Sequence, residues 1–208
     1  MEKMKAVICT KYGPPEVLRI EEIPKPVPEN KEVLIRIKAT TAHIGDTKIR
    51  RFAPGLGPVK DFFFKPLMRF MVGFRRPRNK ILGMEFAGIV ESAGSNVTRF
   101  KPGDEVFATT EFKMGTYAEF ICMREDRMIA LKPVNMTFEE AAPVSNAGIT
   151  VLVNLRKANI QKGQKVLIYG ASGSVGTYAI QIAGAMGARV TAVCSSGNLQ
   201  MVSDLGAV

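Results

Sequence analysis

The sequence predicts an α/β-plus-β protein in which a small β-barrel is followed by a doubly wound parallel α/β domain. Two contrasting patterns support this fold class. The first 125 or so residues contain several short, mostly alternating apolar runs separated by glycine and proline turns, which is typical of a small barrel. Residues 165–196 instead read as strand, glycine turn, helix and strand, a βαβ unit. We therefore expect one domain over residues 1–125 and a second over residues 126–208.

The strands of the barrel are expected at residues 4–9, 17–23, 32–40, 83–93, 105–108 and 116–123. The clearest alternation lies in residues 32–40, where the side chains expected to face the core are Val33, Ile35, Ile37 and Ala39. Leu34 and the basic residues of this strand should mostly face solvent. A short helix is expected to begin near Asp46.

The pattern becomes helical from Thr137 onward. Glu140 follows Thr137 by three residues and completes a capping box, in which each side chain accepts from the backbone N–H of the other residue. A second helix is expected over residues 145–157. Beyond it we expect strands at 166–169 and 190–194 with a helix between them, and a further helix over 198–205.

The turn inside the βαβ unit reads Gly170-Ala171-Ser172-Gly173-Ser174-Val175-Gly176. Small residues are required where the chain turns sharply, where the backbone approaches a pyrophosphate and where the helix packs on the sheet. The helix N-terminus also presents N–H groups and a partial positive charge to an anion. In this context the pattern predicts dinucleotide binding, and the cofactor-binding candidates are Ser172, Gly173, Ser174 and Val175. The alternative is a glycine-rich turn that only packs.

The end of the second strand indicates which dinucleotide is bound. A carboxylate at this point would accept a hydrogen bond from the ribose 2′-OH of NAD. The sequence has Ser195, Ser196 and Asn198 instead, and the next acidic residue is Asp204. Because hydroxyl and amide groups can donate to a 2′-phosphate and no carboxylate repels it, we expect NADPH rather than NADH.

Composition restricts the class of protein. The chain has 208 residues, with 29 Lys and Arg against 19 Asp and Glu, and a formal net charge of +10. This positive charge suits an anionic cofactor, and because no nucleic-acid-binding motif accompanies it we expect no nucleic-acid partner. The three cysteines are far apart and read as reduced thiols. Without an apolar run long enough to span a membrane or an apparent signal peptide, we expect a cytoplasmic protein.

Residues 53–80 differ from the rest of the barrel region because phenylalanines and methionines alternate there with lysines and arginines. Such a basic, apolar stretch can lie on a membrane surface, and we consider that contact for residues 60–80. Because Pro66, Gly73 and Pro77 interrupt the run, the sequence favours a lid or dimer segment whose apolar side covers a pocket.

The parallel domain contains at most the first of the two halves that build a doubly wound sheet. Two parallel strands leave an exposed sheet edge, which is available for pairing with another chain. We therefore expect a homo-oligomer, most simply a dimer.

Five stretches taken together resemble one known family: LIRIKATTAHIGDTKIRR, ILGMEFAGIVESAGSNVTRFKPGDEVFA, GTYAEF, AGITVL and the glycine turn. They resemble the medium-chain dehydrogenase/reductase superfamily, specifically its zinc-free quinone-oxidoreductase-like branch. The resemblance implies a GroES-like β-barrel domain followed by a Rossmann domain. It also implies that Thr150 lies beside the cofactor.

The same resemblance bears on metal binding. In zinc-dependent relatives a cysteine lies where this chain has His43, and a histidine lies where it has Met84, next to Glu85. Methionine is a poor zinc ligand, and a catalytic zinc needs about three ligands from His, Cys or carboxylate groups. We therefore expect no metal site. His43, the single histidine, becomes the candidate catalytic residue that donates a proton or polarises a substrate oxygen.

These observations predict a zinc-independent, NADPH-dependent oxidoreductase that transfers hydride to a quinone or an α,β-unsaturated carbonyl. One alternative is an enoyl-thioester reductase of the same superfamily. Another, from a different functional class, is a non-catalytic NADPH-binding or interaction module, because the nucleotide domain is incomplete.

Overall fold

The computed structural model describes residues 2–53, 57, 62, 66–67, 69–70 and 72–208. The chain divides into two compact units, Met1–Pro143 and Val144–Val208. The boundary lies later than the predicted one at residues 125 and 126. Two short elements account for the difference, because β7 (Ile129–Leu131) pairs with a barrel strand and α3 (Phe138–Ala141) contacts two others.

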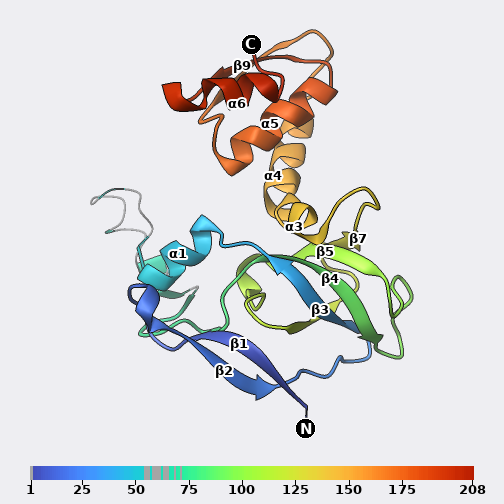
Figure 1. The fold of residues 1–208 in the computed structure, drawn as a ribbon. Coiled ribbons are helices and arrows are strands. Elements are labelled where there is room, and N and C mark those ends of the chain that lie inside the picture. The colour runs from blue at the N-terminus through green and yellow to red at the C-terminus, as the bar shows by residue number, and fades with distance from the viewer. Residues whose placement is uncertain (1, 54–56, 58–61, 63–65, 68, 71) are drawn as a thin grey trace. The chain divides into compact units, whose positions relative to one another are not determined.

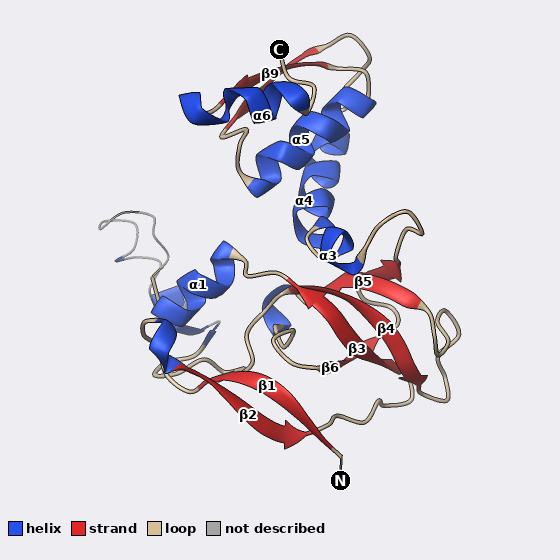
Figure 2. Ribbon diagram, viewed as in Figure 1, coloured by secondary structure: helices blue, strands red, loops and turns tan. Residues whose placement is uncertain are grey.

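The first unit is an antiparallel barrel (Figures 1 and 2). A hairpin of β1 (Lys3–Cys9) and β2 (Leu18–Pro24) adjoins a five-stranded sheet in the order β6-β3-β4-β5-β7. The remaining strands of that sheet are β3 (Glu32–Thr40), β4 (Glu85–Ala93), β5 (Glu105–Thr109) and β6 (Phe120–Arg124). Bridges from Ala6 to Ala118 and from Ile8 to Ile81 link the hairpin to the rest of the barrel.

The barrel core consists of side chains from the inner faces of these strands and their connections: Val33, Ile35, Phe86, Val90, Phe100, Val106, Ala108, Met123 and Ile129. The predicted solvent-facing position of Leu34 is wrong, because this side chain is only 5% exposed. A register shift between Leu34 and Ile35 interrupts the pairing of β3 with β4. A β-bulge of this kind breaks strict alternation, so three consecutive residues are buried.

Helix α1 (Ile44–Arg51) follows β3 and packs on a second apolar cluster. This cluster contains Cys9, Val17, Ile49, Val72, Leu82, Met84 and Met114. The capping box predicted for Thr137 and Glu140 is confirmed at the start of α3.

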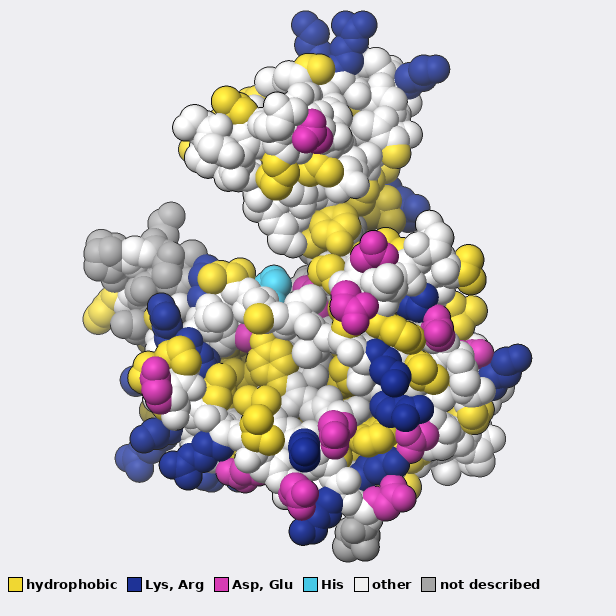
Figure 3. Space-filling view, viewed as in Figure 1, with side chains coloured by type: hydrophobic (Ala, Val, Ile, Leu, Met, Phe, Trp, Pro, Cys, Tyr) yellow, Lys and Arg dark blue, Asp and Glu magenta, His cyan; other side chains and the backbone are white. Residues whose placement is uncertain are grey.

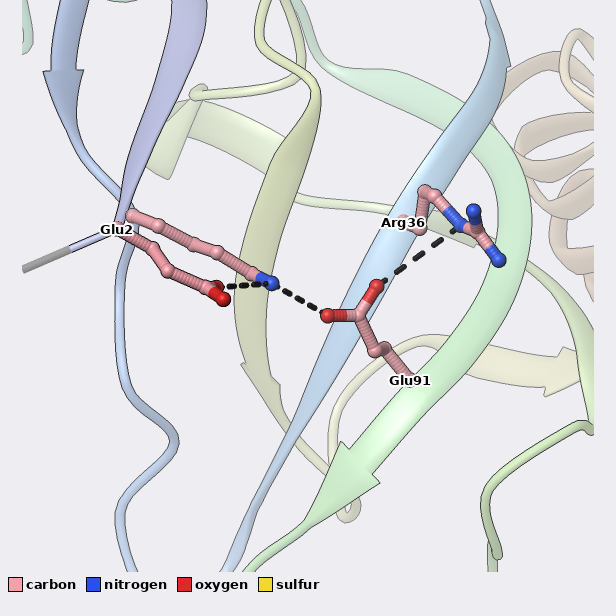
Figure 4. A network of polar contacts seen from close by, with 4 residues as sticks. Glu2, Arg36 and Glu91 are labelled. Atoms are coloured by element: carbon pink, nitrogen blue, oxygen red, sulfur yellow. Dashed lines mark hydrogen bonds and ion pairs between the residues drawn. The ribbon is translucent and has the colours of Figure 1, made fainter.

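A network of charges ties the N-terminal strand to the outside of the barrel (Figure 4). The Lys25 ammonium lies 2.9 Å from Glu2 Oε2 and 2.5 Å from Glu91 Oε1. Arg36 Nε lies 3.9 Å from the second oxygen of Glu91, and Lys25 Nζ lies 4.2 Å from the ring centre of Phe120.

The second unit begins with α4 (Val144–Lys157) and contains the predicted βαβ arrangement. Strand β8 (Lys165–Tyr169) leads through the glycine turn into α5 (Ser174–Ala185), and β9 (Arg189–Val193) pairs with β8 in parallel. Helix α6 (Leu199–Asp204) follows a short 3₁₀ turn. At the end of the chain the backbone N–H of Val208 donates to the carbonyl of Val190, so this segment approaches β9 as a third strand would.

One face of the β8–β9 pair is covered and the other is open. The core of this unit contains Ala171, Ile180, Ala183, Val190, Val202 and Ala207. Leu167 and Tyr169 lie on the opposite face and are exposed. Within the parts of the chain that the structure describes, no helix is both long and apolar enough to cross a bilayer.

Candidate functional site

The glycine turn is shaped by close approach of the backbone. Gly170 has φ of +76°, which favours glycine over residues with a Cβ. A Cβ added to Gly176 would lie 2.4 Å from the carbonyl oxygen of Gly170, so the first turn of α5 needs this glycine. Ala171 stands where the dinucleotide-binding pattern G-x-G-x-x-G has its first glycine, and it is fully buried in the core of the unit. Alanine at this position is therefore compatible with the turn.

The turn is fixed to the end of the neighbouring strand. The N–H groups of Gly170 and Ala171 both donate to the carbonyl oxygen of Val193, each at 3.0 Å. The glycine turn after β8 and the Ser195–Asn198 turn after β9 therefore lie at the same carboxyl edge of the sheet. This edge is where open α/β sheets bind nucleotides.

The N-terminus of α5 has the features of an anion site. Gly173 is the N-cap, and in residues 144–208, all of which are described, no side chain caps this helix. Gly173, Ser174 and Val175 are exposed and Ser172 is half-buried. A helix of 12 residues that begins in this way directs its first N–H groups and its partial positive charge at an incoming phosphate. The turn thus fits the pyrophosphate of a dinucleotide.

The second turn supplies hydroxyl groups and no carboxylate. Asn198 Nδ2 donates to Ser195 Oγ at 3.0 Å, and the 3₁₀ turn spans Ser196–Asn198. Ser195 and Ser196 are exposed. Because Ser195 Oγ accepts from Asn198, its own hydrogen can be donated elsewhere. The structure thus brings the predicted residues of both turns to one edge.

Thr150 lies on α4 and is exposed. Its carbonyl accepts from Asn154 Nδ2 at 2.8 Å. This bond does not involve the threonine hydroxyl, so its placement beside a cofactor stays a prediction.

In the barrel, His43 is the N-cap of α1. Its Nδ1 accepts from the N–H of Gly45 at 3.0 Å, while the N–H of His43 donates to Asp46 Oδ2 at 3.2 Å. An imidazole that accepts at Nδ1 carries its proton at Nε2 when neutral. The half-buried ring, visible in Figure 3 (cyan), therefore presents an Nε2–H donor.

Asp46 is the centre of a hydrogen-bonded group that sequence reasoning did not identify as part of a site. The residue is only 3% exposed. Oδ1 accepts from the N–H of Gly83 at 3.1 Å, and Oδ2 accepts from the Tyr117 hydroxyl at 2.9 Å. Burial raises the pKa of Asp46, and the donated hydrogen bonds from Tyr117 and Gly83 oppose that rise.

Tyr117 is the second residue that the sequence did not single out. Burial raises its pKa well above the ordinary value, and the neighbouring Asp46 charge raises it further. The tyrosine therefore keeps its single hydroxyl hydrogen, which it donates to Asp46 Oδ2 at 2.9 Å and shares with the more distant carbonyl of Thr41 at 3.2 Å. Asp46 and Tyr117 are separated by 71 positions in the sequence. No local pattern could have connected them, although each falls within a stretch that resembles the family.

An apolar pocket of about 350 Å³ adjoins this group. Its walls include Val7, Leu18, Ala42, Leu82, Asp46 and Tyr117. A mostly apolar hollow with a few oriented polar groups is the usual form of a small-molecule site.

Met84 and Glu85, which bear on the question of zinc binding, lie in the same part of the barrel. Met84 is buried, and its Cε would lie 3.1 Å from a Cβ added to Gly45, next to the His43 ring. Glu85 is also buried and accepts from the Thr41 hydroxyl at 3.2 Å. Within the described residues, no three or more His, Cys, Asp or Glu side chains gather where they could hold a metal ion.

The barrel and the βαβ edge together define a class of protein, and the comparisons agree. Residues 29–134 match the family model described as alcohol dehydrogenase GroES-like domain. The chain belongs to the medium-chain dehydrogenase/reductase superfamily, in its quinone-oxidoreductase-like branch. The predicted fold class, a GroES-like barrel followed by part of a Rossmann domain, is thereby confirmed.

Three similar proteins illustrate this membership. The mitochondrial NAD(P)H oxidoreductase RTN4IP1 of Mus musculus is 35% identical over 98% of this chain and 52% of its own length. The quinone oxidoreductase of Sus scrofa is 34% identical over 90% of this chain and 51% of its own. The structure of Escherichia coli quinone oxidoreductase complexed with NADPH has a TM-score of 0.77 and 30% identity, covering 98% of this chain and 56% of that one.

The chain spans about half the length of the curated relatives it matches. The names of these relatives are those of NAD(P)H and quinone oxidoreductases.

Proposed function

We propose that this chain provides the barrel and the first nucleotide-binding half of an oxidoreductase that uses NADPH and works without zinc. Its substrate would be a quinone or an α,β-unsaturated carbonyl. The observation that carries this proposal is the common edge shared by the glycine turn and the Ser195–Asn198 turn. The NADPH in the Escherichia coli structure supports the cofactor assignment.

The nucleotide-binding residues have separate tasks in this proposal. The N–H groups at the start of α5, around Ser172–Val175, would bind the pyrophosphate. Ser195, Ser196 and Asn198 would donate to the 2′-phosphate that distinguishes NADPH from NADH. Thr150 is proposed to lie beside the cofactor. When bound, the nicotinamide supplies the hydride.

In the barrel, His43 would be the residue that contacts the reacting oxygen. Negative charge develops on a quinone or carbonyl oxygen as hydride arrives at carbon, and a donor aimed at that oxygen stabilises it. The Nε2–H of His43 is such a donor. Asp46 would act as a positioning residue, since it accepts from the His43 backbone, and Tyr117 would hold Asp46 in place.

The first test is a thermal-shift titration of the chain with NADPH and NADH in parallel. A ligand that binds only the folded state adds about 2.7 kcal/mol of stability at a concentration one hundred times its Kd. We expect a shift with NADPH and a much smaller one with NADH at equal concentration. Equal shifts, or a larger one with NADH, would contradict the role of the serines, and no shift with either would contradict nucleotide binding by this chain.

A matched pair of variants tests the 2′-phosphate contact directly. Ser196→Asp places a carboxylate in the turn after β9, whereas Ser203→Asp adds the same charge on α6, and both positions are exposed. We expect Ser196→Asp to weaken NADPH binding at least about tenfold, the effect of roughly 1.4 kcal/mol, and to spare NADH. Equal weakening of NADPH binding by the two variants would show that any added negative charge has this effect, and it would contradict a specific contact from Ser196.

The catalytic proposal is tested by steady-state NADPH oxidation with a panel of quinones, enones and enoyl thioesters. Turnover of quinones or enones is expected. Turnover of enoyl thioesters alone would replace the proposed substrate class. A folded, NADPH-binding sample that turns over no panel member would be the non-catalytic module.

We further propose that the chain forms dimers through the edge of β8. Within residues 144–208, all of which are described, β8 pairs only with β9, which leaves its other edge available. Sedimentation velocity over a range of concentrations should show a monomer–dimer equilibrium, and a monomer at all concentrations would contradict it.

A further inference from the structure

A patch of aromatic and basic side chains lies on the barrel unit and includes none of the residues proposed for chemistry. We define the aromatic–basic patch by its described members: Arg69, Phe70, Phe74, Arg75, Arg76, Arg78 and Lys80. Residues 54–56, 58–61, 63–65, 68 and 71 of the predicted lid or membrane segment lie outside the described residues. Phe70 and Phe74 are 72% and 73% exposed, and nearby Phe62 and Leu67 are 75% and 54% exposed. Such exposure of large apolar side chains indicates an interaction surface.

The patch is held on a fixed support. Val72 is buried in the apolar cluster beneath α1. The Tyr12 hydroxyl donates to the carbonyl of Gly73 at 2.8 Å, and the N–H of Arg78 donates to the carbonyl of Val72 at 2.8 Å. Gly73 has φ of +122°, so the chain turns sharply there. Residues 74–76 are therefore presented outward on a loop with anchored ends.

The charges of the patch have one sign. From Phe62 to Met84 the sequence contains no aspartate or glutamate. The arginines also lie against aromatic rings: Arg69 is 5.5 Å from the centre of the Phe74 ring, and Arg78 is 5.7 Å from that of Phe70. Cationic groups are thus held beside exposed apolar rings, around a hollow of about 580 Å³.

We propose that the aromatic–basic patch binds the surface of an anionic phospholipid membrane. The phenylalanines would enter the boundary between headgroups and acyl chains, while the arginines and Lys80 would contact the lipid phosphates. The exposure of the phenylalanines supports this surface rather than the lid that the sequence alone favours, because Phe70 and Phe74 are 72% and 73% exposed and a lid would bury its apolar side. A free anion would use the arginines but give no reason for the exposed rings.

The test is co-sedimentation of the full chain with vesicles. Neutral phosphatidylcholine vesicles are compared with vesicles that also contain phosphatidylglycerol. We expect binding to the anionic vesicles, weakened by added salt because surface charges are screened. Absence of binding to anionic vesicles would overturn the proposal.

Two double variants separate the contributions. Arg75→Ala/Arg76→Ala should weaken binding by about 25-fold, since each cation near an anionic surface contributes about fivefold. Phe70→Ser/Phe74→Ser should weaken it by at least about tenfold through lost apolar contact. The matched control is Lys31→Ala/Lys101→Ala, which removes the same charge at exposed positions elsewhere on the barrel unit.

The control should bind within about twofold of the parent, and thermal unfolding should show that all variants fold. An equal loss in the lysine control would mean that only net charge matters, and it would overturn the proposal. Undiminished vesicle binding by the phenylalanine variant would also overturn it, because it would reduce the patch to a general anion-binding surface.

Discussion

The two units build their candidate sites from different parts of the chain. In the second unit the site consists of backbone N–H groups and small side chains around Gly170–Gly176. Its geometry requires glycines without a Cβ, since an added Cβ at Gly176 would collide with the backbone. In the first unit it consists of the His43, Asp46 and Tyr117 side chains. His43 is held by a hydrogen bond within the first turn of α1, and Asp46 is held by hydrogen bonds from Gly83 and Tyr117 in other parts of the barrel. The nucleotide edge is therefore sensitive to added atoms, and the barrel site is sensitive to lost polar atoms.

The largest effect should come from adding one methyl group to the glycine turn. In Gly176→Ala the new Cβ would lie 2.4 Å from the Gly170 carbonyl oxygen, so the turn must shift. We expect a loss of about 3 kcal/mol in the free energy of unfolding, together with loss of NADPH binding. Gly184→Ala on the same helix meets no atom within 4 Å and should stabilise by roughly 0.5 to 1 kcal/mol. Urea denaturation of the two variants checks this contrast, which equal effects would contradict.

Removal of the carboxylate at the centre of the barrel site should have the next largest effect. Asp46→Asn replaces one accepting oxygen with an NH₂ group, so the buried donors of Tyr117, Gly83 and His43 cannot all be satisfied. We expect a loss of about 2 kcal/mol, measured by urea denaturation at neutral pH. Asp126→Asn, at an exposed pair with Arg124, is the control and should change stability little. A neutral effect of Asp46→Asn would contradict the described hydrogen bonding.

The contributions of Asp46 and Asp126 to the stability of the protein should change with pH in opposite directions. The folded protein raises the pKa of Asp46, so unfolding releases its proton and this group's contribution to stability falls as pH rises above about 4. Arg124 lowers the pKa of Asp126 to about 2, so its contribution is present above the ordinary value and is lost as pH falls toward 2. Unfolding curves across this range for each variant and the parent test both signs, and parallel curves would contradict them.

A smaller effect on stability is expected at His43, where capping and chemistry can be separated. His43→Ala removes the Nδ1 acceptor for Gly45 and should destabilise by about 1 kcal/mol. His43→Ser restores an N-cap acceptor and should recover most of that loss, whereas both variants lack the Nε2–H donor. If His43 polarises the substrate oxygen, both should lower kcat by about 10²-fold in the NADPH oxidation assay. Recovery of kcat by serine would instead assign His43 a capping role alone.

The smallest effect should be at the charge network on the outside of the barrel. Lys25→Met leaves Glu2 and Glu91 without their shared cation (Figure 4). Both acids raise the pKa of Lys25, the Glu91 hydrogen bond most strongly. We expect a slight loss of thermal stability that disappears in high salt, because the network is near the surface. A large, salt-independent loss would show that the lysine acts through its packing on Phe120.

The sequence could predict the edge that the glycine turn and the Ser195–Asn198 turn share, because the determinants of that edge are local. The strand, the glycines and the serines lie within residues 165–198, and the required spacing is visible in a single stretch. The barrel site could not be predicted in the same way. Asp46, Gly83 and Tyr117 meet only when three separate segments fold together, and burial of the Asp46 carboxylate has no local signal.

The errors in the barrel have the same origin. The burial of Leu34 follows from a bulge in the pairing of β3 with β4, which depends on the partner strand. The division between the two compact units falls later than the predicted domain boundary because β7 and α3, with three and four residues, are too short to show a period. Each is defined by contact with the barrel rather than by its own sequence.

Helix α1 connects two surfaces of the barrel unit. His43 caps the first turn of this helix, and Phe52 caps its last turn. The ring centre of Phe52 lies 4.7 Å from that of Tyr12. Arg69 of the aromatic–basic patch lies 5.4 Å from the ring centre of Phe52. With a rise of about 1.5 Å per residue, the helix is about 12 Å long. If the patch rests on a bilayer, a quinone dissolved in the lipid would leave it about one helix length from His43. An apolar substrate of the proposed class would then have about one helix length to cross between the bilayer and His43.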